Sequence, residues 1–290
     1  MDLKKNLKIF LKIFFTVFAL FFIFQRVELK EILKTFEKCK KIDLFFAFVF
    51  FNFSKIISSV RLNLFFKNLG FKLKEIDALR LYYIGMFYNL FLPGGIGGDG
   101  YKIYLLKRAN FADFKSLFQA TLLDRISGLI PLIIFAGILF FFSNLSSRFE
   151  WLIFFDIFVL ILIFPLLWGI YKFLFKRFYN LLFSSTLLGF LTQFFQLLSA
   201  YFIAKSLFIE DDFLIDTLFL FLISSIVAVL PISFGGIGLR EGVFLYGFFL
   251  LNLPAQKGVA FGIIFFLITA ISSFVGLFLK EEKSLNSKEL

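Results

Sequence analysis

The sequence contains no histidine and only one cysteine, Cys39. These two shortages exclude an intramolecular disulfide, a zinc site built from histidine and cysteine, haem ligation by histidine, and a Ser-His-Asp triad. Metal sites made only of carboxylates stay open, but the sequence points to none. It therefore predicts no metal, no other cofactor and no catalytic residue.

Charged residues are also scarce, at 18% of the chain, whereas hydrophobic residues make up 60%. The mean hydropathy is +0.91, and soluble domains are only about half apolar. This composition excludes a soluble fold and leaves no room for a separate soluble catalytic domain. We expect a single integral membrane domain over residues 1–290.

Long apolar runs recur along the chain, and several reach the ~20 residues that a helix needs to cross a ~30 Å hydrocarbon layer. None alternates polar and apolar residues as the strands of a membrane barrel do. The sequence therefore predicts an all-α polytopic membrane protein. The runs cover residues 7–24, 44–57, 117–142, 151–175, 187–208, 213–230 and 259–279.

The formal net charge of +11 could suggest a nucleic-acid partner. The basic residues lie beside the apolar runs, however, so cytoplasmic flanks and anionic lipid headgroups explain them more simply. We therefore expect membrane lipids, and no nucleic acid, as partners. No small-x-small cleavage site follows the first apolar run, which predicts an uncleaved anchor.

A glycine motif occurs twice, about half the chain length apart: residues 94–97 and 235–238 both read Gly-Gly-Ile-Gly. Paired segments interrupted by glycine and proline in the two halves of a transporter mark broken helices, with the binding site between them. The motif predicts half-repeats over about 1–145 and 146–280, followed by a short polar tail, 281–290.

Basic residues predict the orientation, because they gather in cytoplasmic loops. The segment 61–80 and the segment 102–115 are both basic, so a helix that enters, turns at the glycines and returns should join them. We expect residues 79–106 to form this re-entrant hairpin, and the second motif to form another from the outside. The prediction is six full spans and two hairpins, inverted with respect to each other, with both termini cytoplasmic.

An alternative of eight full spans stays open. The six-span scheme places the loop 26–41 outside, although this loop holds six basic residues. Accompanying acids contribute little to orientation, so the conflict is not removed by them.

Each motif is expected to begin a half-helix, whose N-terminus offers free N–H groups and about half a positive charge to an anion. In the first copy Asp99 is placed to cap the helix, and Lys102 lies about one turn further on. In the second copy Arg240 suits a bound phosphate and Glu241 offsets its charge. The alternative is that the glycines only let helices pack closely.

Charged residues also occur within the apolar runs. Asp124 and Arg125 should face the interior of the bundle, because a charge at the bilayer centre costs ~2.5 to 3.5 kcal/mol on insertion scales. For Lys55 and Asp156, two readings stay open: snorkelling to a nearby headgroup region, or a functional role.

At these positions the sequence resembles the flippase-like transmembrane region of bacterial lysylphosphatidylglycerol synthases and their free-standing relatives. The resemblance runs over nearly the whole chain and implies a multi-pass protein of the bacterial inner membrane that handles an anionic lipid. It departs from the family in carrying Lys102 where relatives usually have arginine, and in ending at Leu290 without a soluble synthase domain. Aminoacyl transfer is therefore not expected. The matching motifs are Asn89-x-x-Leu92-Pro93-Gly94-Gly95-Ile96-Gly97-Gly98-Asp99, Asp124-Arg125, and Pro231-x-Ser233-x-Gly235-Gly236-Ile237-Gly238-x-Arg240-Glu241-Gly242.

The resulting hypothesis is a lipid translocase or lipid-handling protein that binds an anionic phospholipid or polyprenyl-linked headgroup between two half-helix N-termini. A membrane-embedded enzyme acting on a lipid-linked sugar or phosphate, and an accessory subunit, are the alternatives. A homo-oligomer and a partner synthase both stay open. The residues predicted to line the headgroup site or translocation path are Pro93, Gly94, Gly95, Gly97, Gly98, Asp99, Lys102, Asp124, Arg125, Gly235, Gly236, Gly238, Arg240 and Glu241.

Overall fold

The computed structural model describes residues 29–71, 73–91, 97–109, 111–229 and 238–279, and the regular elements in these ranges are all helical. Five segments are long and apolar enough to cross a membrane, which confirms the prediction of an all-α membrane protein. The first predicted span, 7–24, lies outside the described residues. The five segments are Lys41–Asn68, Phe114–Phe141, Glu150–Leu174, Lys176–Ser206 and Ala255–Phe278.

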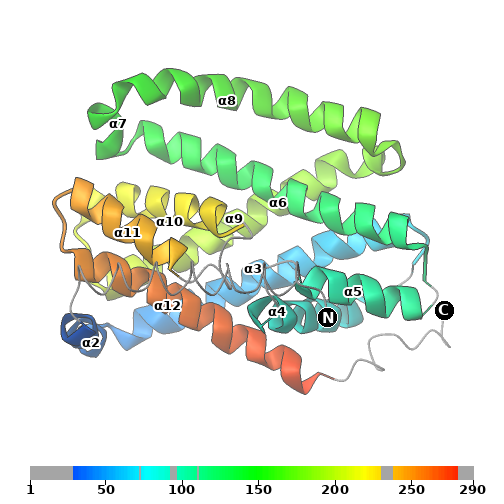
Figure 1. Ribbon diagram of the computed structural model, residues 1–290, viewed down its shortest axis with the longest axis horizontal. Helices are drawn as coiled ribbons and strands as arrows, with labels where there is room; N and C mark the ends of the chain where they lie inside the picture. The colour runs from blue at the N-terminus through cyan, green and yellow to red at the C-terminus, as the bar shows by residue number, and fades with distance from the viewer. Residues whose placement is uncertain (1–28, 72, 92–96, 110, 230–237, 280–290) are drawn as a thin grey trace, which may run out of the picture.

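These long segments run lengthwise through the molecule (Figure 1). The short helix α2 (Leu29–Lys38) is seen end-on in Figure 1, so it lies across their direction at one end of the bundle. The long helices are α3 (Lys41–Asn68), α6 (Phe114–Phe141), α8 (Glu150–Gly169, continued by the π-helical turn Ile170–Leu174), α9 (Leu182–Ser206, preceded by the 3₁₀ turn Lys176–Leu181) and α12 (Ala255–Phe274, continued by the 3₁₀ turn Val275–Phe278); α7 (Asn144–Arg148) and the turn Asp211–Phe213 are short connections.

α3 is longer than the apolar run that predicted it. The helix continues to Asn68 because its last turns bury Leu62, Phe65 and Phe66, each no more than 2% exposed. Arg61 therefore lies inside a membrane helix, and its assignment to the basic loop 61–80 was wrong. The charge of Arg61 must be satisfied within the bundle.

Four shorter helices form two pairs. α4 (Glu75–Phe91) packs against α5 (Gly97–Arg108), and α10 (Leu214–Val229) packs against α11 (Leu239–Leu250). None of the four is among the five candidate spans. Figure 1 shows the first pair in one half of the long axis and the second pair in the opposite half. The segments 92–96 and 230–237, which join the helices of each pair, lie outside the described residues.

The helices of the first pair touch backbone to backbone. A Cβ atom added to Gly98 of α5 would lie 1.8 Å from the carbonyl oxygen of Gly85 in α4. Only glycine permits this approach, because it has no Cβ. The side chain of Lys102, one turn further along α5, also lies against Gly85. α5 therefore packs closely against α4.

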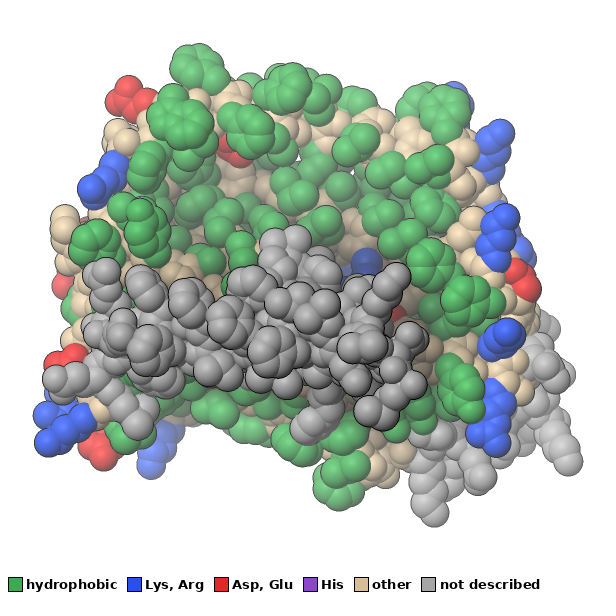
Figure 2. Space-filling view, in the orientation of Figure 1, with side chains coloured by type: hydrophobic (Ala, Val, Ile, Leu, Met, Phe, Trp, Pro, Cys, Tyr) green, Lys and Arg blue, Asp and Glu red, His purple; other side chains and the backbone are tan. Residues whose placement is uncertain are grey.

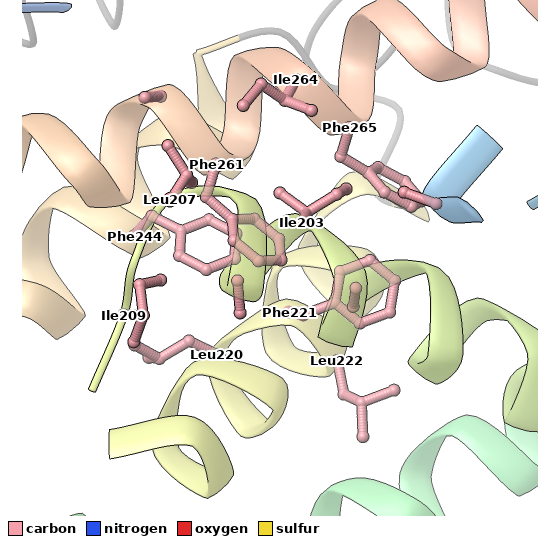
Figure 3. Packing of buried hydrophobic residues seen from close by; sticks show 14 of the residues in the cluster. Ile203, Leu207, Ile209, Leu220, Phe221, Leu222, Phe244, Phe261, Ile264 and Phe265 are labelled. Atoms are coloured by element: carbon pink, nitrogen blue, oxygen red, sulfur yellow. The ribbon is translucent and has the colours of Figure 1, made fainter. Parts of the chain in front are cut away.

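Aromatic side chains fill the core that joins the second pair to α12 (Figure 3). Phe244 of α11 and Phe261 of α12 have ring centroids 4.4 Å apart. Phe221 of α10 and Phe265 of α12 meet edge to face at 4.8 Å. All four are buried. Burial of such rings fixes how α10 and α11 sit against the long helices.

The surface carries a broad hydrophobic band, with charged side chains gathered at its two ends (Figure 2). The outlying helix α8 contributes to this band, exposing 78% of Phe154 and 70% of Trp151. Lipid tails are as apolar as these side chains, so the band matches a bilayer interior. Figure 2 also shows basic and acidic side chains recessed within the band, which a lipid-facing surface does not explain.

Candidate functional site

The start of α5 is capped by α4. The backbone N–H of Gly98 donates to Oδ1 of Asn89 at 2.8 Å, which satisfies one of the free N–H groups of a helix N-terminus. The capping role predicted for Asp99 is therefore corrected. Asp99 does lie in the first turn of α5, where a negative charge is favourable, but its carboxylate is bound to basic side chains.

Asp99 joins two cations. Lys102 Nζ lies 2.7 Å from one carboxylate oxygen, and Nε of Arg125 on α6 bonds to the other. Asp99 and Lys102 are each about 95% buried. The ammonium of Lys102 also stands over the ring of Tyr82, 5.1 Å from its centroid. This group carries one more base than acid, close to the positive end of α5.

The neighbouring residue of α6, Asp124, faces a different partner. Nε of Arg61 on α3 donates to Asp124 Oδ1 at 2.8 Å, and both side chains are less than 10% exposed. The guanidinium lies against Gly128, where a Cβ would come within 2.8 Å of Nη1. Nη1 is buried and has no hydrogen-bond partner among the described residues. Asp124 and Arg125 thus tie α6 to α3 and α5.

The start of α11 is built differently. Gly238 has a φ of +82°, a left-handed conformation that favours glycine, and its N–H donates to Glu241 Oε2 at 2.7 Å. Glu241 is 4% exposed, and the absence of a side chain at Gly262 leaves room for it. Its carboxylate therefore caps the helix and also neighbours Arg240 along the chain.

Arg240 and Lys55 stand over two rings that touch each other. The guanidinium of Arg240 lies 5.0 Å from the centroid of Phe265, and the ammonium of Lys55 lies 4.5 Å from that of Phe51. The two rings meet edge to face at 5.6 Å. Arg240 Nη1 makes one long bond, 3.4 Å, to Ser225 Oγ. Both cations face aromatic surface rather than a carboxylate.

The structure therefore brings together two parts of the predicted site and leaves others undescribed. Gly97 is the first residue of α5, and Gly98, Asp99, Lys102 and Arg125 form one group. Gly238, Arg240 and Glu241 form the other, at the start of α11. The predicted residues outside the described ranges are Pro93, Gly94, Gly95, Gly235 and Gly236.

Sequence reasoning missed three contributors: Arg61, Asn89 as a helix cap, and Ser225. Arg61 had a usable signal, because Asp124 within an apolar run required a partner. Asp156, left open from the sequence, lies on α8 against Gly137 of α6, away from this network. Within the described ranges, no group of three acidic or cysteine side chains could hold a metal ion.

Around the starts of α5 and α11, together with Lys55 and Arg61 on α3, the described residues hold more bases than acids. The carboxylates of Asp156 and Asp216 lie outside these groups. Burying charge is costly, and each buried charge needs a counter-charge. The surplus makes the site suited to an anion. The bases are Lys55, Arg61, Lys102, Arg125 and Arg240, and the acids are Asp99, Asp124 and Glu241.

Comparison with known proteins adds one extended match. A family model described as "Lysylphosphatidylglycerol synthase TM region" matches residues 9–276, which include both glycine motifs. A protein of Pyrococcus horikoshii described as "UPF0104 membrane protein PH1989" is 27% identical over 99 residues. That alignment covers 33% of this chain and 30% of the Pyrococcus protein. No solved structure matches the chain.

Proposed function

The chain belongs to the family of the lysylphosphatidylglycerol synthase transmembrane region, and we propose that it binds the anionic headgroup of a membrane lipid and moves that lipid between leaflets. The observation that carries this proposal is the local surplus of basic side chains around the starts of α5 and α11. An anion held there would sit within the hydrophobic band, where the acyl chains of a lipid can stay in the bilayer.

The proposal includes the two helix pairs as re-entrant hairpins. α5 has 12 residues and rises about 18 Å, and α11 has the same length, so neither can cross a ~30 Å hydrocarbon layer. The pairs occupy opposite halves of the molecule in Figure 1. Helices entering from opposite leaflets would aim their positive N-termini at a common region near mid-membrane.

We propose binding and movement of the lipid rather than its covalent conversion. The three carboxylates at the proposed site are all engaged: Asp99 with Lys102 and Arg125, Asp124 with Arg61, and Glu241 with the amide of Gly238. A general base must instead be able to reach a substrate proton. The orientation proposed is that of a bacterial inner-membrane protein with both termini in the cytoplasm.

Reconstitution in liposomes tests the proposal. A fluorescent phosphatidylglycerol would be followed between leaflets by dithionite quenching, with the matching phosphatidylcholine as the neutral-headgroup reference. Arg240→Ala should slow phosphatidylglycerol movement about tenfold or more, because a hydrogen bond to a charged group contributes ~1.5 to 3 kcal/mol.

The matched control is Lys205→Ala, which removes an exposed lysine that lies over Tyr201 on α9. This variant should move the lipid at the wild-type rate. Wild-type protein that moves neither lipid faster than empty liposomes would refute translocation. An Arg240→Ala variant with an unchanged rate would refute the role given to Arg240.

A further inference from the structure

The short helix α2 lies across the direction of the long helices, at one end of the bundle (Figure 1). Directly after α2, the backbone N–H of Lys40 donates to the carbonyl oxygen of Ser206, the last residue of α9, at 3.2 Å. α3 then begins at Lys41, and α2 also packs against α12. The ends of membrane-spanning helices mark the edge of the apolar layer, so α2 lies at the boundary between hydrocarbon and water.

One side of α2 holds it on the bundle. Ile32 is 1% exposed and packs against Val259, in the second turn of α12. Phe36, one turn after Ile32, belongs to the same group, as do Leu245 of α11 and Ile263 of α12. Because residues i and i+4 lie on one side of a helix, Ile32 and Phe36 fix that side of α2 toward α11 and α12.

The opposite side of α2 carries a row of lysines, which we call the lysine stripe: Lys30, Lys34 and Lys38. At about 100° per residue, Lys34 lies about 180° around the helix from the midpoint of Ile32 and Phe36. All three lysines are exposed, and within the described ranges none of them forms an ion pair. The stripe therefore faces away from the bundle.

The edges of the lysine stripe differ from its centre. Glu31 and Glu37 are exposed on α2, one at each edge of the stripe. Leu33 lies between Glu37 and the packed side and is 55% exposed. Figure 2 shows basic and acidic side chains at the corner of the molecule where Figure 1 places α2.

The position of α2 decides what its lysine stripe meets. A charged side facing water is ordinary for a surface helix of a soluble protein. α2 instead lies at the edge of an apolar layer, where the same side lies among lipid headgroups. Helices that lie in the plane of this boundary have lysines on their polar side and apolar residues on the other, and they are attracted to anionic lipids.

We propose that the lysine stripe of α2 binds the anionic phospholipid headgroups of the adjacent leaflet. The stripe would raise the concentration of anionic lipid beside α11 and α12, the helices that carry Arg240 and Phe265. This surface is separate from the proposed headgroup site inside the bundle, and it does not require that a lipid crosses the membrane. It gives the basic residues of α2 a role in whichever leaflet they lie.

A fluorescent label on α2 tests the proposal locally. Leu33→Cys in a Cys39→Ser background would carry bimane at an exposed position beside the stripe. The protein would be placed in phosphatidylcholine nanodiscs that contain either spin-labelled phosphatidylglycerol or spin-labelled phosphatidylcholine at the same mole fraction. Quenching should indicate about fivefold more phosphatidylglycerol than phosphatidylcholine beside the label, which is equivalent to about 1 kcal/mol. High salt should reduce this ratio, because it screens exposed charges.

Three variants identify the source of the enrichment. Lys30→Gln/Lys34→Gln/Lys38→Gln removes the charges but keeps good helix formers, so it should bring the ratio close to one. Lys30→Arg/Lys34→Arg/Lys38→Arg keeps the charges and should keep the ratio. Lys107→Gln removes an exposed lysine at the end of α5, at the opposite end of the bundle, and should have no effect.

Equal quenching by the two lipids in the protein with its native lysines would overturn the proposal and leave an acidic protein as the candidate partner. A ratio that survives in the triple glutamine variant would overturn the role of the lysine stripe. Quenching by aqueous iodide, with none by either lipid, would place α2 outside the headgroup layer and also overturn the proposal. These measurements are made at equilibrium, so their failure leaves the proposed movement of lipid between leaflets standing.

Discussion

At the scale of single residues, adjacent side chains in one helix have separate partners. Asp124 faces Arg61 on α3, while Arg125 reaches Asp99 on α5. A helix turns about 100° per residue, so neighbouring side chains point in different directions. Two consecutive charges on α6 can therefore fasten two different helices. Asp124 and Arg125 therefore each link α6 to a different helix.

Removal of one partner of the Arg61–Asp124 pair is expected to cost much more stability than replacement of both partners by apolar residues. Arg61→Met leaves a buried carboxylate without its partner and should destabilise the protein by ~3 to 5 kcal/mol. The double variant Arg61→Met/Asp124→Leu removes both charges and should recover most of that loss. Denaturant unfolding in detergent, followed by circular dichroism, measures both.

The control for these two variants is Lys67→Met. It removes an exposed lysine at the end of α3 that pairs with Glu75. Exposed pairs contribute ~0 to 1 kcal/mol, so little change is expected. A double variant no more stable than Arg61→Met would mean that the pair is not an isolated unit.

At the scale of elements, the two glycine-led helices begin in different ways. α5 receives its cap from Asn89 of α4, whereas α11 is capped by its own Glu241. The first arrangement depends on the close contact of α4 with α5, and the second depends on the left-handed Gly238. The repeated motif therefore supports two related helix starts with different local chemistry.

Gly98→Ala tests the contact between α4 and α5. The added methyl group would overlap the Gly85 carbonyl oxygen, so the helices must separate, at a cost of ~1 to 3 kcal/mol. Gly100→Ala is the matched control, because nothing lies within 4 Å of its Cβ position. That control should be neutral or stabilising by ~0.5 to 1 kcal/mol, since alanine favours a helix over glycine. Thermal unfolding in detergent compares them, and equal midpoints would contradict the predicted contact.

At the scale of the whole molecule, the arrangement of long and short helices follows from the bilayer. Long helices satisfy their own backbone hydrogen bonds across the apolar layer. Shorter helices leave unpaired groups at their ends, so those ends must lie within protein or face a polar guest. Figure 2 shows charged side chains recessed below the surface of the hydrophobic band.

Cysteine accessibility tests the re-entrant pairs. In a Cys39→Ser background, Lys67→Cys and Lys107→Cys flank the α4–α5 pair, and Asn252→Cys follows α11; all three positions are exposed. A re-entrant pair predicts that an impermeant maleimide labels positions 67 and 107 from the cytoplasmic side and position 252 from the other. Labelling of positions 67 and 107 from opposite sides would favour the eight-span alternative.

The sequence by itself determined the class of fold and the family. Apolar runs of bilayer length require helices whatever their neighbours are, because unpaired backbone groups are too costly in lipid. The glycine motifs were recognisable because glycine is needed locally, as Gly98 and Gly238 show. The predicted burial of Asp124 followed from the same cost of charge in an apolar layer.

Only the tertiary structure decided which charges meet. Arg61 and Asp124 are 63 positions apart, and their contact depends on how α3 packs against α6. The capping of α5 by Asn89, and the placement of Lys55 and Arg240 on two touching rings, likewise depend on several helices at once. Hydropathy marks which residues enter the membrane, but side-chain packing between helices decides their partners.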